Sequence, residues 1–136
     1  MLPWMDPSYQ WRGTFTDADV NALHAEGFGH PELDIEWRDQ VERHSLGWVC
    51  AYEGDRLVGF VNVAWDGGVH AFVLDTVVTA DARHQGIGAG LVDMATAEAR
   101  AVGCEWLHVD FEEDLRGFYF GACGFASTPA GVIALR

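Results

Sequence analysis

A short stretch, Arg83–Ala89, has the residue types that could hold a phosphate group. Gly86 and Gly88 lack a Cβ, so a diphosphate could approach the backbone closely, and Arg83 supplies a forked cation where the stretch begins. The residues before it are typical of a strand and those after it of a helix. At such a junction the first helical N–H groups have no partner within the helix and carry partial positive charge. The pattern predicts a phosphate-binding loop, although similar glycines also occur in simple turns before helices.

Two other nucleotide-binding loops do not fit the sequence. A Walker loop requires Gly-Lys-Ser/Thr, and the chain has no lysine. A dinucleotide fingerprint requires a loop directly after the first strand of a βαβ repeat, with a ribose-binding acid further along. Here the loop follows several predicted strands, so the context is wrong.

A second segment, Phe118–Phe125, lies on the last predicted helix and the residues that leave it. With the loop, it resembles the GNAT superfamily of N-acetyltransferases. Arg83–Gly88 reads R-x-x-G-x-G, which matches that family's acyl-CoA signature Q/R-x-x-G-x-G/A. Phe118–Phe125 reads F-Y-x-x-x-x-G-F and resembles the family's later F-Y-x-x-x-G-F segment, with one extra residue before the glycine. The two segments are separated by a helix and a strand, as in the family, and the resemblance covers roughly Val58–Phe125.

The resemblance implies an α/β (α+β) fold that forms one domain over residues 1–136. Its centre would be a mixed, mostly antiparallel sheet with a splayed parallel strand pair and flanking helices. It also implies an enzyme that transfers the acetyl group of acetyl-CoA, its cosubstrate, to a primary amine of a small molecule or peptide by direct attack in a ternary complex.

The same resemblance implies roles for individual residues. The pantetheine arm would lie along the backbone of Thr76, Val77 and Val78, and the pyrophosphate would be held by main-chain N–H groups of His84, Gln85, Gly86, Ile87, Gly88 and Ala89. Tyr119 matches the tyrosine that protonates the departing CoA thiolate, although the extra residue leaves Phe120 as an alternative match. Many members also have Asn where this chain has Glu112, so the contacts of that loop can differ.

Direct attack requires a neutral amine, and alkylamines are mostly protonated near neutral pH, so a carboxylate or a water chain must accept a proton. The candidates are Asp75, on the strand before the glycine loop, and Asp110, on the strand expected to face it. Either could equally be a surface or structural acid. The resemblance places the acceptor side near Glu36 and Trp37.

The histidines and cysteines favour no metal. His24, His30, His70, His84 and His108 show no ligand spacing, and the three cysteines show no C-x-x-C motif. An odd number of cysteines also argues against a disulfide framework and fits a reducing cytoplasm. A Cys-His nucleophile has no support in the pattern.

The elements that must position these groups follow from periodicity and turn residues. A capping box at Thr16–Asp19 should begin a helix that Gly27 and Gly29 end, and Pro31 should open a second helix. A long helix should follow the glycine loop and end at Gly103. The predicted strands are 10–15, 48–53, 56–65, 70–79, 106–111 and 132–135, and the predicted helices after the loop are 88–102 and 114–122.

The composition and net charge of the chain limit the kinds of partner that it can attract. The chain has 136 residues, with 21 acidic residues against 8 arginines and a formal charge of −13. Such a field repels nucleic acid and anionic membranes, whereas it attracts a cationic amine, unless the acidity only keeps the protein in solution. The first residues do not have the pattern of a signal peptide, and no apolar run is long enough for a membrane span. A cytoplasmic location is therefore expected. A homodimer is left open, as are two non-enzymatic roles, an acyl-CoA-binding domain and an interaction domain.

Overall fold

Short turns and alternating apolar residues build a five-stranded sheet in the order β1-β2-β3-β4-β5. The computed structural model describes residues 6–136. Its strands are β1 (Ser8–Trp11), β2 (Ser45–Glu53), β3 (Arg56–Trp65), β4 (His70–Val78) and β5 (Trp106–His108), and its helices are α1 (Asp17–Phe28), α2 (Trp37–His44) and α3 (Ile87–Ala101). Neighbouring strands are antiparallel except β4 and β5, which are parallel. The predicted mixed sheet with one parallel pair is confirmed.

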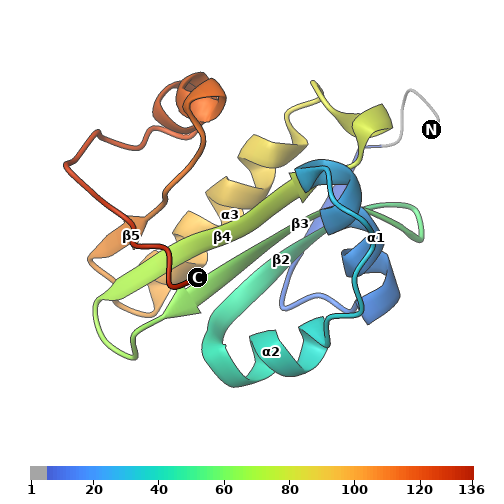
Figure 1. Ribbon diagram of the computed structural model, residues 1–136, viewed down its shortest axis with the longest axis horizontal. Helices are drawn as coiled ribbons and strands as arrows, with labels where there is room; N and C mark the ends of the chain where they lie inside the picture. Colours follow the sequence, from blue (N-terminus) through green and yellow to red (C-terminus); the bar gives the residue numbers. More distant parts are fainter. Residues whose placement is uncertain (1–5) are drawn as a thin grey trace.

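The pleat of the sheet divides the core into two clusters. Along β2, Val49 and Ala51 pack with α3, whereas Trp48 and Cys50 pack with α1 and α2. Figure 1 shows the same arrangement, with α3 behind the sheet and α1 and α2 in front of it. This alternation is the period-two pattern of a strand that is buried on both faces.

A β-bulge interrupts β4 at the point where the site will lie. Phe60 of β3 pairs with Val77 and Asn62 pairs with Leu74, so Asp75 and Thr76 together oppose one residue of β3. Asp75 takes up the extra residue with a φ of 60°, which is uncommon for a residue with a Cβ. The bulge changes which face each later side chain points to, so Val73 packs in the α3 cluster and Val77 in the other.

The structure corrects the predicted second helix. Pro31 does not open it, because α2 begins at Trp37. Asn21 of α1 holds the intervening chain in a non-helical form, since its side chain bonds both the N–H and the C=O of Ile35, at 3.1 and 2.9 Å. The capping prediction for α1 is confirmed, since the Thr16 hydroxyl accepts a hydrogen bond from the Asp19 N–H, and the helix ends at Gly29 with a φ of 69°.

Other predicted boundaries are also wrong. The first strand is β1 at Ser8–Trp11, so residues 12–15 lie outside it, and β5 ends at His108 instead of Phe111. The predicted helix 114–122 is two short turns, η2 (Glu113–Leu115) and the π-helical η3 (Gly117–Ala122). The expected last strand does not form, and its Val132, Ile133 and Leu135 side chains are 84–94% exposed.

Candidate functional site

The two parallel strands separate after three paired residues. The last pair is Phe72 with His108, whereas β4 continues to Val78. The edge of β4 from the bulge to Val78 therefore has no pairing partner in β5. An extended ligand arm could bond to these backbone groups as an added strand would. The residues assigned to the pantetheine arm, Thr76, Val77 and Val78, lie along this edge.

The glycine loop leads from this edge to the start of α3. After η1 (Ala80–Ala82) the chain turns through His84, with a φ of 65°, and Gly86, with a φ of 80°. Gly86 is the N-cap residue, so no side chain caps the helix, and the first turn contains no acidic residue. The first backbone bond within the helix runs from the Gly90 N–H to the Gly86 carbonyl. The N–H groups of Ile87, Gly88 and Ala89 thus remain for an anion.

The two glycines of the loop serve different purposes. A Cβ on Gly86 would meet nothing within 4 Å, so this position is open and its positive φ explains the glycine. A Cβ on Gly88 would lie 3.1 Å from the Phe118 ring. Gly88 is therefore a packing contact between the loop and the Phe118–Phe125 segment. Arg83 is exposed, and its Nε–H donates to the Val78 carbonyl at 3.3 Å.

Tyr119 is buried beside the bulge of β4. Its side chain is 5% exposed and its ring lies 4.9 Å from that of Phe111, in a stacked arrangement. Burial raises the pKa of its phenol, the nearby Thr76 hydroxyl lowers it, and Cys123 and Asp110 raise it further. The phenol is therefore protonated near neutral pH and can donate.

Thr76 adds an unsatisfied group at the same place. Its Oγ1 is buried and forms no hydrogen bond with any of the described residues. A buried hydroxyl of this kind is costly unless a ligand atom completes its bonding. The unpaired edge, the uncapped helix start and this hydroxyl together fit acyl-CoA.

Asp75 points to the other face, toward α1. Its Oδ1 lies 3.0 Å from His24 Nε2, and the side chains of Asp75 and His24 are 26% and 18% exposed. His24 Nδ1 lies 2.7 Å from His30 Nε2, and His30 Nδ1 lies 2.7 Å from the Pro31 carbonyl oxygen. No sequence pattern links the two histidines to Asp75, because they are 51 and 45 positions from it and only the fold brings the three groups together.

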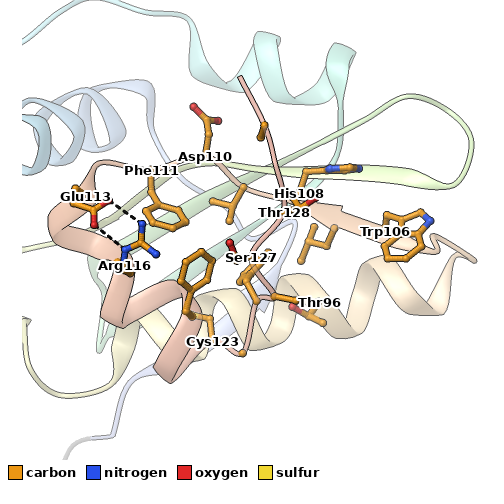
Figure 2. A pocket seen from close by; sticks show the side chains of 17 residues that line it. Thr96, Trp106, His108, Asp110, Phe111, Glu113, Arg116, Cys123, Ser127 and Thr128 are labelled. Carbon is orange, nitrogen blue, oxygen red and sulfur yellow. Dashed lines mark hydrogen bonds and ion pairs between the residues drawn. The ribbon is translucent and has the colours of Figure 1, made fainter. Parts of the chain in front are cut away.

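Asp110 lies beyond the end of β5, and its side chain is exposed. It lines a cavity of about 800 Å³ along the outer edge of β5, together with Thr96 of α3 and aromatic rings. Figure 2 shows this cavity, with the ion pair of Glu113 and Arg116 at one end. The lining residues include none of Arg83–Ala89. The cavity and the glycine loop are therefore separate features.

The acceptor side expected near Glu36 and Trp37 is only partly available. Trp37 is 3% exposed, and its indole N–H donates to Asn21 Oδ1. It is a core residue that packs against the His24 ring, at a centroid distance of 5.3 Å. Glu36 precedes α2 as its N-cap and is exposed.

Residues 6–136 contain no group of three His, Cys, Asp or Glu side chains arranged to hold a metal ion. Over the same residues, no helix combines the length and apolar composition of a membrane span.

Known proteins share this fold. The sequence model of the acetyltransferase (GNAT) family matches residues 5–125. Similar solved structures include protein SA2161 of methicillin-resistant Staphylococcus aureus, described as a probable acetyltransferase, with a TM-score of 0.80 and 21% identity over 96% of this chain and 99% of that one. The GNAT family protein SP0256 of Streptococcus pneumoniae has a TM-score of 0.75 and 24% identity over 96% of this chain and 100% of that one. An aminoglycoside acetyltransferase from an uncultured soil metagenomic sample, in complex with sisomicin, has a TM-score of 0.69 and 14% identity over 96% and 94%. No curated protein matches the sequence significantly.

Proposed function

Because the chain belongs to the acetyltransferase (GNAT) family, we propose that it transfers the acetyl group of acetyl-CoA to a primary amine by direct attack. One observation carries this proposal. Where β4 separates from β5, the buried Thr76 hydroxyl forms no hydrogen bond with the described residues, and the buried Tyr119 phenol lies close to it. A thioester at this opening would meet a hydroxyl that lacks a partner and a phenol that can donate.

The residues of the chain would divide the binding task. The unpaired edge Thr76–Val78 would bond the pantetheine arm, and the free N–H groups at the start of α3 would bond the pyrophosphate. Arg83 would add a cation at the start of the loop. The bound thioester supplies an activated acetyl carbon.

Two proton transfers are required of the protein. Tyr119 would give its proton to the sulfur as the C–S bond breaks, which makes the thiolate easier to expel. A carboxylate would take a proton from the ammonium before attack. We favour Asp75, because it is adjacent to Thr76 in the bulge, whereas Asp110 lies beyond the end of β5.

For the acceptor we propose a cationic amine. The formal charge of −13 favours cations over anions at the surface. The structural neighbour in complex with sisomicin also supports this class, since an aminoglycoside carries several amino groups.

The proposal is tested by one added charge at the loop. Gln85→Glu keeps the side-chain size, and an acid at a helix N-terminus does not destabilise the helix. Facing a pyrophosphate, the new carboxylate should weaken acetyl-CoA binding by roughly 1 to 2 kcal/mol, or ~5- to 30-fold in Kd by calorimetry. Gln40→Glu, on exposed α2, makes the same change of net charge away from the loop and should leave Kd unchanged.

Equal affinities for both variants would place the CoA site elsewhere. Transfer itself is measured as loss of the thioester over a panel of amines. A parent protein that binds acetyl-CoA and acetylates no amine would be a binding domain.

A further inference from the structure

The hydrogen-bonded series Asp75, His24 and His30 leads from the bulge of β4 to the surface. Asp75 and His24 are partly buried, and His30 lies in the loop after α1, where it is half-buried. The series ends on the carbonyl oxygen of Pro31. Its contacts of 3.0, 2.7 and 2.7 Å are within hydrogen-bond range.

The partners determine how many protons the series holds. The Pro31 carbonyl only accepts, so His30 Nδ1 must carry a hydrogen. If His30 is neutral, its Nε2 accepts from His24 Nδ1, and His24 Nε2 can then face an ionised Asp75 only as part of an imidazolium. If His30 is charged, its Nε2 donates to His24 Nδ1, and His24 Nε2 donates to Asp75. If both rings are neutral, Asp75 itself must be protonated.

Two neutral rings and an ionised carboxylate would together hold a certain number of protons. Every arrangement that satisfies the three hydrogen bonds holds one proton more than that. With that proton absent, two lone pairs would face each other across one of the short contacts. The closed series in the structure is the proton-loaded state. To empty it, His30 must turn away from Pro31 or His24 and release its proton to water.

We propose that His24 and His30 relay the proton that Asp75 takes from the acceptor ammonium to solvent, which extends the acetyl-transfer function proposed above. One N–H proton of the ammonium passes to Asp75 and leaves through His24 and His30. The freed lone pair forms the C–N bond, and the C–S bond breaks. Tyr119 protonates the sulfur and regains a proton from the attacking nitrogen, so the amide keeps one hydrogen and one proton in total reaches water.

The surroundings of the two rings fit this task. The His24 ring lies 4.4 Å from the Phe28 ring of α1 and 5.3 Å from the Trp37 ring of α2, between centroids, while Asp75 bonds it from β4. Apolar packing on the faces of this ring leaves its nitrogens as the path for a proton. The ring nitrogens of His24 and His30 bond each other, Asp75 or the Pro31 carbonyl oxygen, so they do not converge on a metal ion.

The relay is tested with glutamine variants, because a glutamine can offer one donor and one acceptor but cannot pass a proton. His24→Gln and His30→Gln are compared with His44→Gln at the exposed end of α2. Two probe amines of similar size are used, ethylamine, which is protonated at neutral pH, and trifluoroethylamine, which is mostly neutral there.

We expect both relay variants to lower kcat/KM for ethylamine by ~100-fold near neutral pH, the lower end of what a general base contributes, since Asp75 remains but loses its route to pass the proton on. The loss should be small for trifluoroethylamine and should shrink for ethylamine as rising pH deprotonates it. His44→Gln should match the parent, and acetyl-CoA affinity should be unchanged in all three variants. In the parent, a scalar coupling between the ring nitrogens of His24 and His30 should report their hydrogen bond by NMR.

An equal loss for both amines at every pH would make the histidines a packing link and overturn the relay, as would the absence of the ring-to-ring coupling. If His24→Gln fails to fold, the half-buried His30→Gln gives the same comparison. If the parent protein is active and the variants lose the same fraction of activity with both amines, the relay alone is overturned. If the parent acetylates neither of these amines nor any other, the proposed function is overturned as well.

Discussion

Gly27 sets how closely α1 approaches β4, and replacing it with alanine should destabilise the protein. Glycine inside a helix usually costs about 1 kcal/mol relative to alanine, so helix propensity alone predicts the opposite sign. In the structure, however, a Cβ at position 27 would lie 2.1 Å from Val77 Cγ2. Val77 is branched at Cβ and 5% exposed, so it has little room to move.

The size of the effect follows from these distances. The new methyl must be displaced by about 1.3 Å to reach ordinary contact at 3.4 Å. Overpacking of this kind costs about 1 to 3 kcal/mol. Because the clash is large, the upper part of that range applies, about 2 to 3 kcal/mol. After the gain of about 1 kcal/mol in helix propensity, we expect a net loss of roughly 1 to 2 kcal/mol in the free energy of unfolding.

A double-mutant cycle isolates the contact. Val77→Ala removes Cγ2, and the next atom, Cβ of residue 77, lies 3.3 Å from the added methyl. In that background Gly27→Ala should be neutral or stabilising by up to about 1 kcal/mol, which gives a coupling of roughly 2 kcal/mol. Urea unfolding followed by tryptophan fluorescence measures all four proteins, since Trp37 and Trp48 are buried.

Gly27→Ala should also change the geometry of the candidate site. Moving α1 away from β4 lengthens the bond between His24 Nε2 and Asp75 Oδ1, now 3.0 Å, so turnover should fall in parallel. A Gly27→Ala protein that is as stable as the parent would refute the reasoning, because the methyl would then have space that the structure does not show.

Three further predictions concern the chemistry. Tyr119→Phe should lower kcat by ~100- to 10,000-fold with little change in acetyl-CoA affinity, measured by steady-state kinetics and calorimetry. Because burial raises the pKa of this phenol above its ordinary value of 10.0, ionisation of Tyr119 should cost the parent no activity below about pH 10, and a tyrosine-dependent fall at lower pH would contradict its assignment as the acid. If the acceptor is cationic, kcat/KM should fall as ionic strength rises while kcat stays constant, since the screening length shortens from ~30 Å at ~0.01 M to ~8 Å at ~0.15 M. An anionic acceptor that wins in an amine panel, with no salt dependence, would leave the acidity as a solubility feature.

Much of the sheet could be predicted from the sequence because its signals are local. β3 extends over 56–65, as predicted, and β4 ends one residue before the expected boundary, because turn residues bound each strand. α3 was also predictable, from its apolar period and the glycine before it. The second helix was not, since Pro31 is a good first helical residue, and side chains of the preceding helix set the later start: Asn21 bonds the backbone of Ile35, and Asp17 accepts from the Arg38 N–H.

The candidate site divides in the same way. The loop and Tyr119 lie on contiguous motifs, so their types and spacing were readable, and their roles in binding and catalysis stay predictions. Gly88 needed the fold, because its Cβ direction faces Phe118 and no local pattern shows that contact. A Gly88 substitution would therefore disturb packing as well as any bound phosphate.

The bulge in β4 explains why the two proton-transfer groups can work on one substrate. A regular strand would alternate its side chains in fixed order, but the extra residue lets Asp75 bond His24 on the α1 face while the next residue, Thr76, reaches Tyr119. Glycine would adopt the φ of 60° at position 75 more easily, so the aspartate holds a conformation that costs on the order of 1 to 3 kcal/mol. The bond to His24 and the packing of Gly27 against Val77 hold this conformation in place. The backbone strain thus lies at position 75. A glycine there would relieve the strain, but only a carboxylate could accept the proton that the proposed reaction requires.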